Sequence, residues 1–180
     1  SGTATVTTGL IDNNSFDNCS ALTSSASPTL FDCGSLGANT VVMTLTDQNG
    51  NSSTCAATVT IVSSPVSVVI TADTTTCGYS VSCFAGSDGV ATASGLGGCP
   101  GYSYAWSNGQ SGATASGLGA GTHTVTVTDA TGGTTINTIV LTSPPPFTVT
   151  TTTTGSCEGF GSGSATATAT GGNNCVSPTY

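Results

Sequence analysis

Apolar and polar residues alternate in short runs along most of the chain. Val41, Met43 and Leu45 lie at every second position, and Val125 and Val127 repeat the pattern with Thr between them. A period of two is typical of a β-strand with one buried and one exposed face. Thr suits the exposed face because it is β-branched and carries a hydroxyl group. Helical periodicity is nearly absent, so the sequence predicts an all-β protein.

One stretch of alternating residues occurs twice. Residues 118–133 read LGAGTHTVTVTDATGG, and residues 36–51 read LGANTVVMTLTDQNGN. In both copies an Asp ends the alternating run and a Gly follows three residues later, which favours a type I turn. A unit that returns within one chain indicates tandem modules. We therefore predict a strand, a tight turn and a second strand in each copy.

Prolines divide the chain into three predicted modules, residues 1–64, 65–144 and 145–180. Pro cannot donate a backbone hydrogen bond and stiffens an extended linker. The second and third modules both open on an alternating strand, PVSVVITAD and PFTVTTTT. We expect tandem immunoglobulin-like β-sandwich modules, the first lacking its opening strand and the third cut short.

The aromatic residues of the second module share one face of a predicted strand. Tyr102, Tyr104 and Trp106 lie two residues apart, before an Asn-Gly hairpin turn. A lone Trp in a small sandwich usually fills the space between the sheets. We predict a core that contains Trp106, Tyr104, Val125 and Val127. An aromatic platform for a ligand is the alternative interpretation.

The charge composition excludes several functions. The chain has no Lys or Arg, and seven Asp with one Glu give a net charge of −8. Such a chain offers no cationic contact to nucleic acid or to anionic lipid, and no Lys for a Schiff base. No apolar run reaches the roughly 18 residues of a membrane-spanning helix. We expect no nucleic-acid partner and no direct membrane insertion.

The eight cysteines predict an oxidising, extracytoplasmic setting. There is no CxxC pair and only one His, which argues against zinc. Residues 157–180 match residues 83–104, so the cysteines of the last segment lie opposite those of the second module. The expected bridges are Cys83–Cys99, Cys157–Cys175 and Cys19–Cys33. Cys55 is then left to a partner upstream of this chain, and Cys77 has no evident partner.

Catalysis is not expected. His123 is the only His, on the same predicted face as Val125 and Val127. A Ser-His-Asp triad needs an exposed His beside a nucleophile, and no nucleophile elbow or paired-carboxylate cleft is visible. We predict a partly buried, structural role for His123 and no enzymatic activity.

Polar loops supply candidate binding and modification residues. Asp12, Asp17 and Asp47, each with Asn neighbours, could offer oxygen ligands to Ca²⁺, although Asp and Asn at these spacings are also ordinary turn residues. No other cofactor is expected. The candidate glycosylation residues are Thr74 in a D-[ST]-x pattern and Asn13, Asn18 and Asn51 in N-x-[ST] sequons.

Several blocks of the sequence resemble known repeats of bacterial surface proteins. CFAGSDGVATAS, GYSYAWSNG and LGAGTHTVTVTDATGG occur in order, and residues 65–180 resemble the SprB-type repeat of very large Bacteroidota adhesins. Residues 1–64, with FDNC, FDCGSLGANTV and TDQNGNSSTC, resemble the hyalin-type (HYR) immunoglobulin-like repeat. The resemblance implies an extracellular stalk at the bacterial cell surface, exported by a type 9 secretion system and used in adhesion or gliding.

These observations predict a structural segment of a surface adhesin. Its expected partners are neighbouring modules or other copies of the chain in a surface fibre, and surface polysaccharide or other glycan. The alternatives are a non-catalytic glycan-binding module of a secreted multidomain protein and a subunit of a self-assembling filament.

Overall fold

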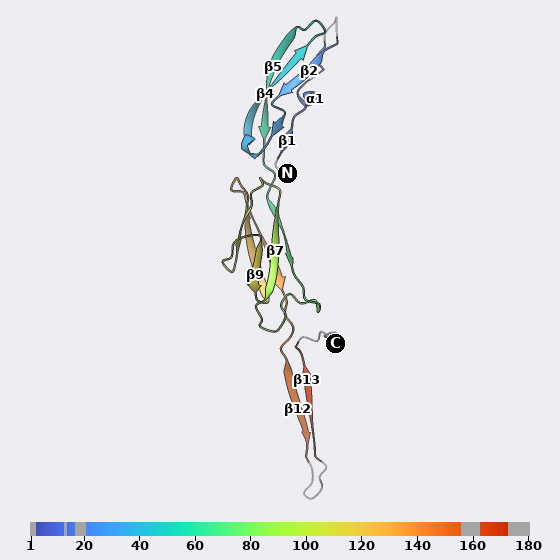
Figure 1. Ribbon diagram of the computed structural model, residues 1–180, viewed down its shortest axis with the longest axis vertical. Coiled ribbons are helices and arrows are strands. Elements are labelled where there is room, and N and C mark those ends of the chain that lie inside the picture. The colour runs from blue at the N-terminus through green and yellow to red at the C-terminus, as the bar shows by residue number, and fades with distance from the viewer. Residues whose placement is uncertain (1–2, 13, 17–20, 156–162, 173–180) are drawn as a thin grey trace, which may run out of the picture. The chain divides into compact units, whose positions relative to one another are not determined.

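The protein is all-β, as the alternation predicts. A computed structural model describes residues 3–12, 14–16, 21–155 and 163–172. These residues form thirteen strands, a four-residue helix α1 (Thr8–Ile11) and a 3₁₀ turn η1 (Cys33–Ser35). No helix in the described ranges is long and apolar enough to cross a membrane. The chain divides into two compact units, which are described separately below. Figure 1 labels strands of both units.

The first unit consists of residues 1–67 together with the segments 96–102 and 128–133. Two antiparallel arrangements build it: a short pair and a sheet of three strands in the order β2-β4-β5. The short pair is β1 (Ala4–Thr5) with β3 (Leu30–Phe31), and the sheet contains β2 (Thr23–Ser27), β4 (Gly37–Thr46) and β5 (Ser52–Ile61).

Buried alternating residues hold the first unit together. Val6, Phe31 and Val41 form its core cluster, and Ile11, Ala26, Val59 and Ile61 pack against it. Val41 and Met43 are buried at alternate positions of β4, whereas Val42 between them is exposed. The period of two in the sequence therefore places one face of β4 in the core.

The second unit is built from two sheets of three strands. One has the order β6-β7-β9 and the other the order β11-β10-β8. The strands are β6 (Ser67–Ala72), β7 (Gly89–Leu96), β8 (Ser103–Trp106), β9 (Thr114–Leu118), β10 (Gly121–Thr128) and β11 (Thr134–Leu141). The Cδ2 atom of Leu141 in β11 lies so close to Gly89 in β7 that a Cβ there would approach it to 2.6 Å, so the two sheets face each other.

The predicted core residues of the second unit lie where the alternation assigns them. Val125 and Val127 are fully buried, Trp106 is 4% exposed and Tyr104 is half-buried. Trp106 Nε1 donates a hydrogen bond to the carbonyl of Gly112 at 3.0 Å, so the ring loses no polar contact on burial.

The last two strands form a separate hairpin of the second unit. β12 (Thr148–Thr154) and β13 (Ser164–Thr170) pair antiparallel from Thr148↔Thr170 to Thr154↔Ser164. All of their residues are exposed. The predicted module boundaries after residues 64 and 144 fall in two segments without strands, residues 62–66 and 142–147.

Leu118→Ala is expected to destabilise the second unit by about 2–5 kcal/mol, because Leu118 is 1% exposed and a truncated buried Leu leaves a cavity. Urea unfolding followed by Trp106 fluorescence measures the change. Ile136→Ala on β11 is the matched control, since Ile136 is 65% exposed. Equal losses of stability in the two variants would contradict this assignment of the core.

Candidate functional site

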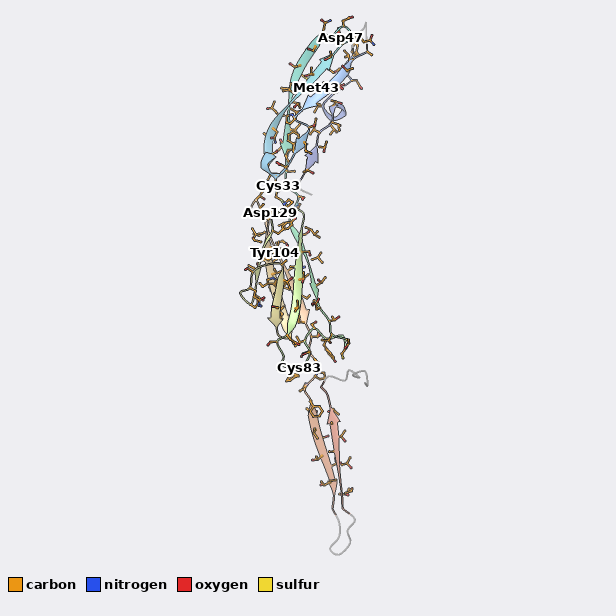
Figure 2. All side chains as sticks on the ribbon, viewed as in Figure 1. Cys33, Met43, Asp47, Cys83, Tyr104 and Asp129 are labelled. Atoms are coloured by element: carbon orange, nitrogen blue, oxygen red, sulfur yellow. A yellow bond between two sulfur atoms is a disulfide. The ribbon has the colours of Figure 1, made fainter. Side chains whose placement is uncertain are left out.

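A disulfide between Cys33 and Cys99 is the central chemical feature of the first unit. Figure 2 labels Cys33 and Asp129. Cys33 opens the 3₁₀ turn η1, and Cys99 lies in segment 96–102, the connection between β7 and β8. The two Cα atoms are 5.7 Å apart, within the range that a disulfide spans. Cys99 is only 1% exposed, so the bond is shielded from solvent on that side.

A capping box positions Cys33. The Asp32 carboxylate accepts a hydrogen bond from the Gly34 N–H at 2.9 Å and another from the Ser35 hydroxyl at 3.3 Å. The Asp32 N–H in turn donates to Ser35 Oγ at 3.5 Å. These reciprocal bonds fix the backbone of the turn that carries Cys33.

Two of the predicted bridges are wrong. Cys83–Cys99 and Cys19–Cys33 do not form, because Cys33 and Cys99 are bonded to each other. Segment 96–102 belongs to the first unit with Cys33, whereas Cys83 belongs to the second unit, where it is exposed and free. The match between residues 157–180 and residues 83–104 showed which cysteines occupy equivalent positions. It did not show which cysteines are close in space, and a disulfide depends on the distance between Cα atoms.

The other cysteines have different outcomes. Cys55 is exposed and free, and Cys77 is disulfide-bonded. The predicted bridge Cys157–Cys175 and the residue Cys19 lie outside the described residues.

The buried carboxylate of Asp129 lies beside the disulfide. Its Oδ2 accepts a hydrogen bond from the Cys99 N–H at 3.0 Å. Its Oδ1 accepts three more, from the N–H and the hydroxyl of Thr131 at 2.9 and 2.8 Å and from the Gly133 N–H at 2.8 Å. Asp129 is 7% exposed. The turn after β10 is therefore held by the carboxylate and attached to the backbone of Cys99.

These bonds stabilise the charged form of Asp129. The Cys99 N–H and then the Thr131 hydroxyl lower the pKa of the carboxyl from 3.8 to about 2, with smaller contributions from the Gly133 and Thr131 N–H groups and against the opposing effect of burial. Hydrogen bonds to the ionised form favour it in this way.

Gly98 lies between the disulfide and the carboxylate of Asp129. Its N–H donates to both the carbonyl and the hydroxyl oxygen of Ser64 at 3.1 Å. Its φ is +54°, and a Cβ at this position would lie 2.3 Å from Asp129 Oδ2. Only glycine therefore fits between the disulfide and the carboxylate. We call Cys33, Ser64, Gly98, Cys99 and Asp129 the disulfide cluster.

Asp47 forms the same turn in the first copy of the repeated stretch. Its Oδ1 accepts from the N–H groups of Asn49 and Asn51 at 2.9 and 2.8 Å, and its Oδ2 accepts from the Asn51 side-chain amide at 2.9 Å. The Asn51 side chain is the main cause of its lowered pKa. Asp129 differs from Asp47 in accepting a hydrogen bond from outside its own turn, from the Cys99 N–H.

The calcium candidates use their oxygens within their own loops. Asp12 Oδ1 accepts from the hydroxyl and the N–H of Ser15 at 2.6 and 2.9 Å, which lowers its pKa, and both oxygens of Asp47 are engaged as above. Asp17 lies outside the described residues. The described part of the chain holds no group of three His, Cys, Asp or Glu side chains that could bind a metal.

The remaining candidate residues are mostly engaged in structural contacts. His123 is half-buried, with Nε2 2.9 Å from the carbonyl oxygen of Gly119. The hydroxyl groups of two tyrosines of the proposed aromatic platform are also bonded: Tyr102 donates to Gly97 O at 2.5 Å, and Tyr104 accepts from Gly95 N–H at 3.2 Å.

Among the glycosylation candidates, Thr74 is exposed, and the Asn51 amide bonds Asp47. Asn13 and Asn18 lie outside the described residues. Glycosylation of these positions stays a prediction.

A cavity of about 200 Å³ borders the disulfide within the first unit. Cys33, Cys99, Leu36 and Val62 are among its lining residues. Phe31 is its one aromatic lining residue, and because Phe31 is 2% exposed its ring is not offered to a sugar.

Sequence reasoning missed the parts of the cluster that depend on distant contacts. It identified Asp129 as a turn residue but not as an acceptor for the Cys99 N–H, which comes from another loop. Gly97-Gly98 before Cys99 was the available signal, because paired glycines often mark a close approach of backbone.

Comparisons of the chain with protein-family models, with curated proteins and with solved structures found no match.

Asp129 is expected to make the folding stability depend on pH in the acid range. Its folded pKa of about 2 lies below its ordinary value of 3.8, so its contribution to stability is present above about pH 4 and is lost as the pH falls toward 2. Urea midpoints measured between pH 2 and pH 6 should show a smaller change for Asp129→Asn than for the wild type. Asp73→Asn, an exposed carboxylate, is the control. An unchanged pH profile in Asp129→Asn would exclude this role.

Gly98→Ala is expected to destabilise the first unit more than Gly132→Ala. Both glycines have positive φ, +54° and +87°, so each alanine incurs the left-handed strain of about 1–2 kcal/mol. Only Gly98 would also clash with Asp129, since no atom lies within 4 Å of a Cβ at Gly132. Thermal unfolding by circular dichroism compares the two. Equal destabilisation would show that the clash has no energetic consequence.

Proposed function

We propose that this chain is a structural segment of the stalk of a large, secreted bacterial surface adhesin, composed of HYR-like and SprB-like modules. The observation that carries the proposal is the disulfide cluster. It joins residues 66 positions apart in the chain and holds the backbone of Cys99 by a buried hydrogen bond from its N–H to Asp129. Such a crosslink suits a protein whose task is to resist extension.

The position of the disulfide determines how tension passes along the chain. Apart from the separate bond of Cys77, a force applied to the two ends travels from Cys33 through the S–S bond to Cys99 and bypasses residues 34–98. That loop contains the long β4–β5 hairpin, whose ladder runs from Gly37↔Ile61 to Thr46↔Ser52. The disulfide closes a loop over a separation of 66 residues. At about 3.5 Å per residue, it therefore keeps roughly 230 Å of chain from being extended.

The crosslink also favours the folded state in the absence of force. Closing a loop of this separation removes disorder from the unfolded chain, and the chain-entropy account gives about 4 kcal/mol. Disulfides persist in oxidising compartments. The bonds of Cys33, Cys77 and Cys99 therefore support an extracellular location.

The composition fits a surface exposed to proteases and to other cells. The chain has no Lys or Arg, so it presents no site to trypsin-like enzymes. The exposed faces of its strands carry mainly Thr and Ser, whose hydroxyl groups keep the surface hydrated without charge. The proposed role is adhesive and mechanical rather than catalytic. We also propose that the protein is exported by a type 9 secretion system and takes part in gliding.

The stalk is better supported than a glycan-binding module. Protein sites for sugars usually present exposed aromatic faces, whereas Trp106 is 4% exposed and Phe31 beside the cavity is 2% exposed. The exposed residues Phe16, Phe84 and Phe147 lie outside the strands, in three different loops. The tyrosines of the same strand face use their hydroxyl groups in contacts within the fold. Neighbouring modules are the proposed partners of the stalk, and surface glycans remain candidate ligands for other parts of such an adhesin.

In a chain that also carries Cys77→Ser, Cys33→Ser is expected to lengthen the fully extended chain by roughly 230 Å relative to oxidised Cys77→Ser alone, because the Cys33–Cys99 bond no longer withholds residues 34–98. The Cys77→Ser background is needed because Cys77 lies within that loop and is itself disulfide-bonded. Single-molecule force spectroscopy measures this difference as added contour length. Cys55→Ser, which removes an exposed free thiol, is the matched control and should leave the length unchanged. Equal lengths for Cys77→Ser alone and for Cys77→Ser with Cys33→Ser would refute the proposed path of force.

The surface location has its own test. Antibodies raised against the chain should label intact cells of the native source. Labelling only after the cells are lysed would overturn the surface proposal, whatever the force measurement gives.

A further inference from the structure

The β12–β13 hairpin exposes apolar side chains on a surface that nothing in the described residues covers. Every residue of both strands is exposed, including Val149 at 55%, and Phe147 just before β12 is 67% exposed. An isolated two-stranded hairpin is marginally stable in water. This hairpin therefore has the properties of one part of a larger sheet.

The chain itself contains a second version of this hairpin, formed by β6 and β7. Ser67 Oγ donates to Leu96 O at 3.3 Å, and Thr148 Oγ1 donates to Thr170 O at 3.4 Å in the same register position. Both second strands are followed by two glycines of positive φ.

The glycine pairs make the same contacts. The N–H of Gly98 bonds the carbonyl of Ser64 at 3.1 Å, and the N–H of Gly172 bonds that of Pro145 at 2.9 Å. The two hairpins are thus structural repeats, and the register equates Ala91 with Ala165, Ala93 with Ala167 and Val68 with Val149.

Equivalent residues of the two hairpins differ sharply in burial. Val68 is 9% exposed, Ala91 is fully buried and Ala93 is 1% exposed. Their counterparts Val149, Ala165 and Ala167 are all exposed. The same face that forms core in β6–β7 is open in β12–β13.

The cover over β6–β7 comes from β8 to β11, that is from residues 103–141. β9 pairs with β7 through Ala91↔Ala115 and Thr92↔Thr114, and the two Thr hydroxyl groups lie 3.1 Å apart. On the face of β7, Leu141 and the carbonyl of Leu118 leave no room for a Cβ at Gly89. The second hairpin keeps a glycine, Gly163, at the position equivalent to Gly89.

We propose that β12–β13 is a docking surface for a polypeptide segment of the same type as residues 103–141. A strand of the β9 type pairs with the edge of β13 that no described strand occupies, with its Thr opposite Thr166 and its Ala opposite Ala165. Strands of the β8, β10 and β11 types then cover Val149, Ala165 and Ala167. Main-chain hydrogen bonds supply the affinity and the small side chains supply the fit.

The chemistry of the surface identifies this partner. Neither β12 nor β13 contains a charged residue, so recognition rests on backbone pairing and apolar contact and is insensitive to salt. The hairpin of a second copy is a poorer partner, because it presents the same Thr and Ala side chains without the large residues that cover β6–β7. This docking surface is a property beyond the proposed stalk function, and it does not depend on that function.

A synthetic peptide of residues 103–141 tests the proposal with the full chain. Hydrogen exchange followed by mass spectrometry should show that saturating peptide slows exchange of the amides in residues 164–170 at least tenfold. A scrambled peptide of the same composition should leave the exchange unchanged. Absence of protection by the native peptide would overturn the proposal.

Two substitutions separate docking from a general effect on β13. Ala167→Asp places a charge on the face equivalent to buried Ala93 and should weaken peptide binding at least tenfold. Thr168→Asp places the charge on the opposite face, equivalent to exposed Ser94, and should leave binding within about twofold. Equal effects of the two variants would contradict docking on the proposed face.

Two further measurements cover the remaining outcomes. Should the free peptide aggregate, the same segment attached after Tyr180 through a flexible linker replaces it, again with Ala167→Asp for comparison. Sedimentation of the chain alone tests the competing occupant: a dimer in which residues 164–170 are protected would assign the surface to a second copy and overturn the proposal. Failure here leaves the force measurement unaffected, since Cys33 and Cys99 lie outside the hairpin.

Discussion

Because the chain has no Lys or Arg, neutral hydrogen-bond donors stabilise those carboxylates of the described residues whose pKa is lowered. Asp129 is the extreme case, a buried carboxylate with one donor from a distant loop and three from its own turn. Asp47 and Asp12 follow the same rule at the surface, and Ser82 does the same for Asp88, whose pKa is also lowered. Because the donors are mostly backbone N–H groups, each carboxylate fixes the conformation of a loop.

This constraint connects the turns to the disulfide. Cys99 contributes its sulfur to Cys33, its N–H to Asp129 and its carbonyl to the Ala130 N–H at 3.2 Å. One buried residue thus joins three segments of the first unit that are far apart in the chain. The covalent bond sets the length of chain that can be extended, and the hydrogen bonds set the local geometry around it. The proposed mechanical role rests on this arrangement.

The repeated hairpins show how the protein assembles its sheets from small, uncharged strands. β6–β7 and β12–β13 share their register and their terminal glycine pairs. Their strands are rich in Thr and Ala, which form ladders readily but bury little apolar surface alone. Stability therefore comes from the larger residues of β8 to β11, where Trp106, Leu118 and Val125 are buried. A hairpin of this kind is complete only when such a segment covers it.

The sequence by itself determined the local structure of this protein. Alternation identified β4 and β10, and the Asp–Gly spacing identified the turns at Asp47 and Asp129. The alternation within the strands that contain Trp106 and Val125 identified these two residues as core. These features depend on neighbours a few residues apart, and a repeated pattern is a reliable signal for them. Tertiary structure alone decided that Cys99 bonds Cys33 rather than Cys83, and that Asp129 accepts from the Cys99 N–H. The physical reason is that both depend on distances between segments far apart in the chain, which no local pattern encodes.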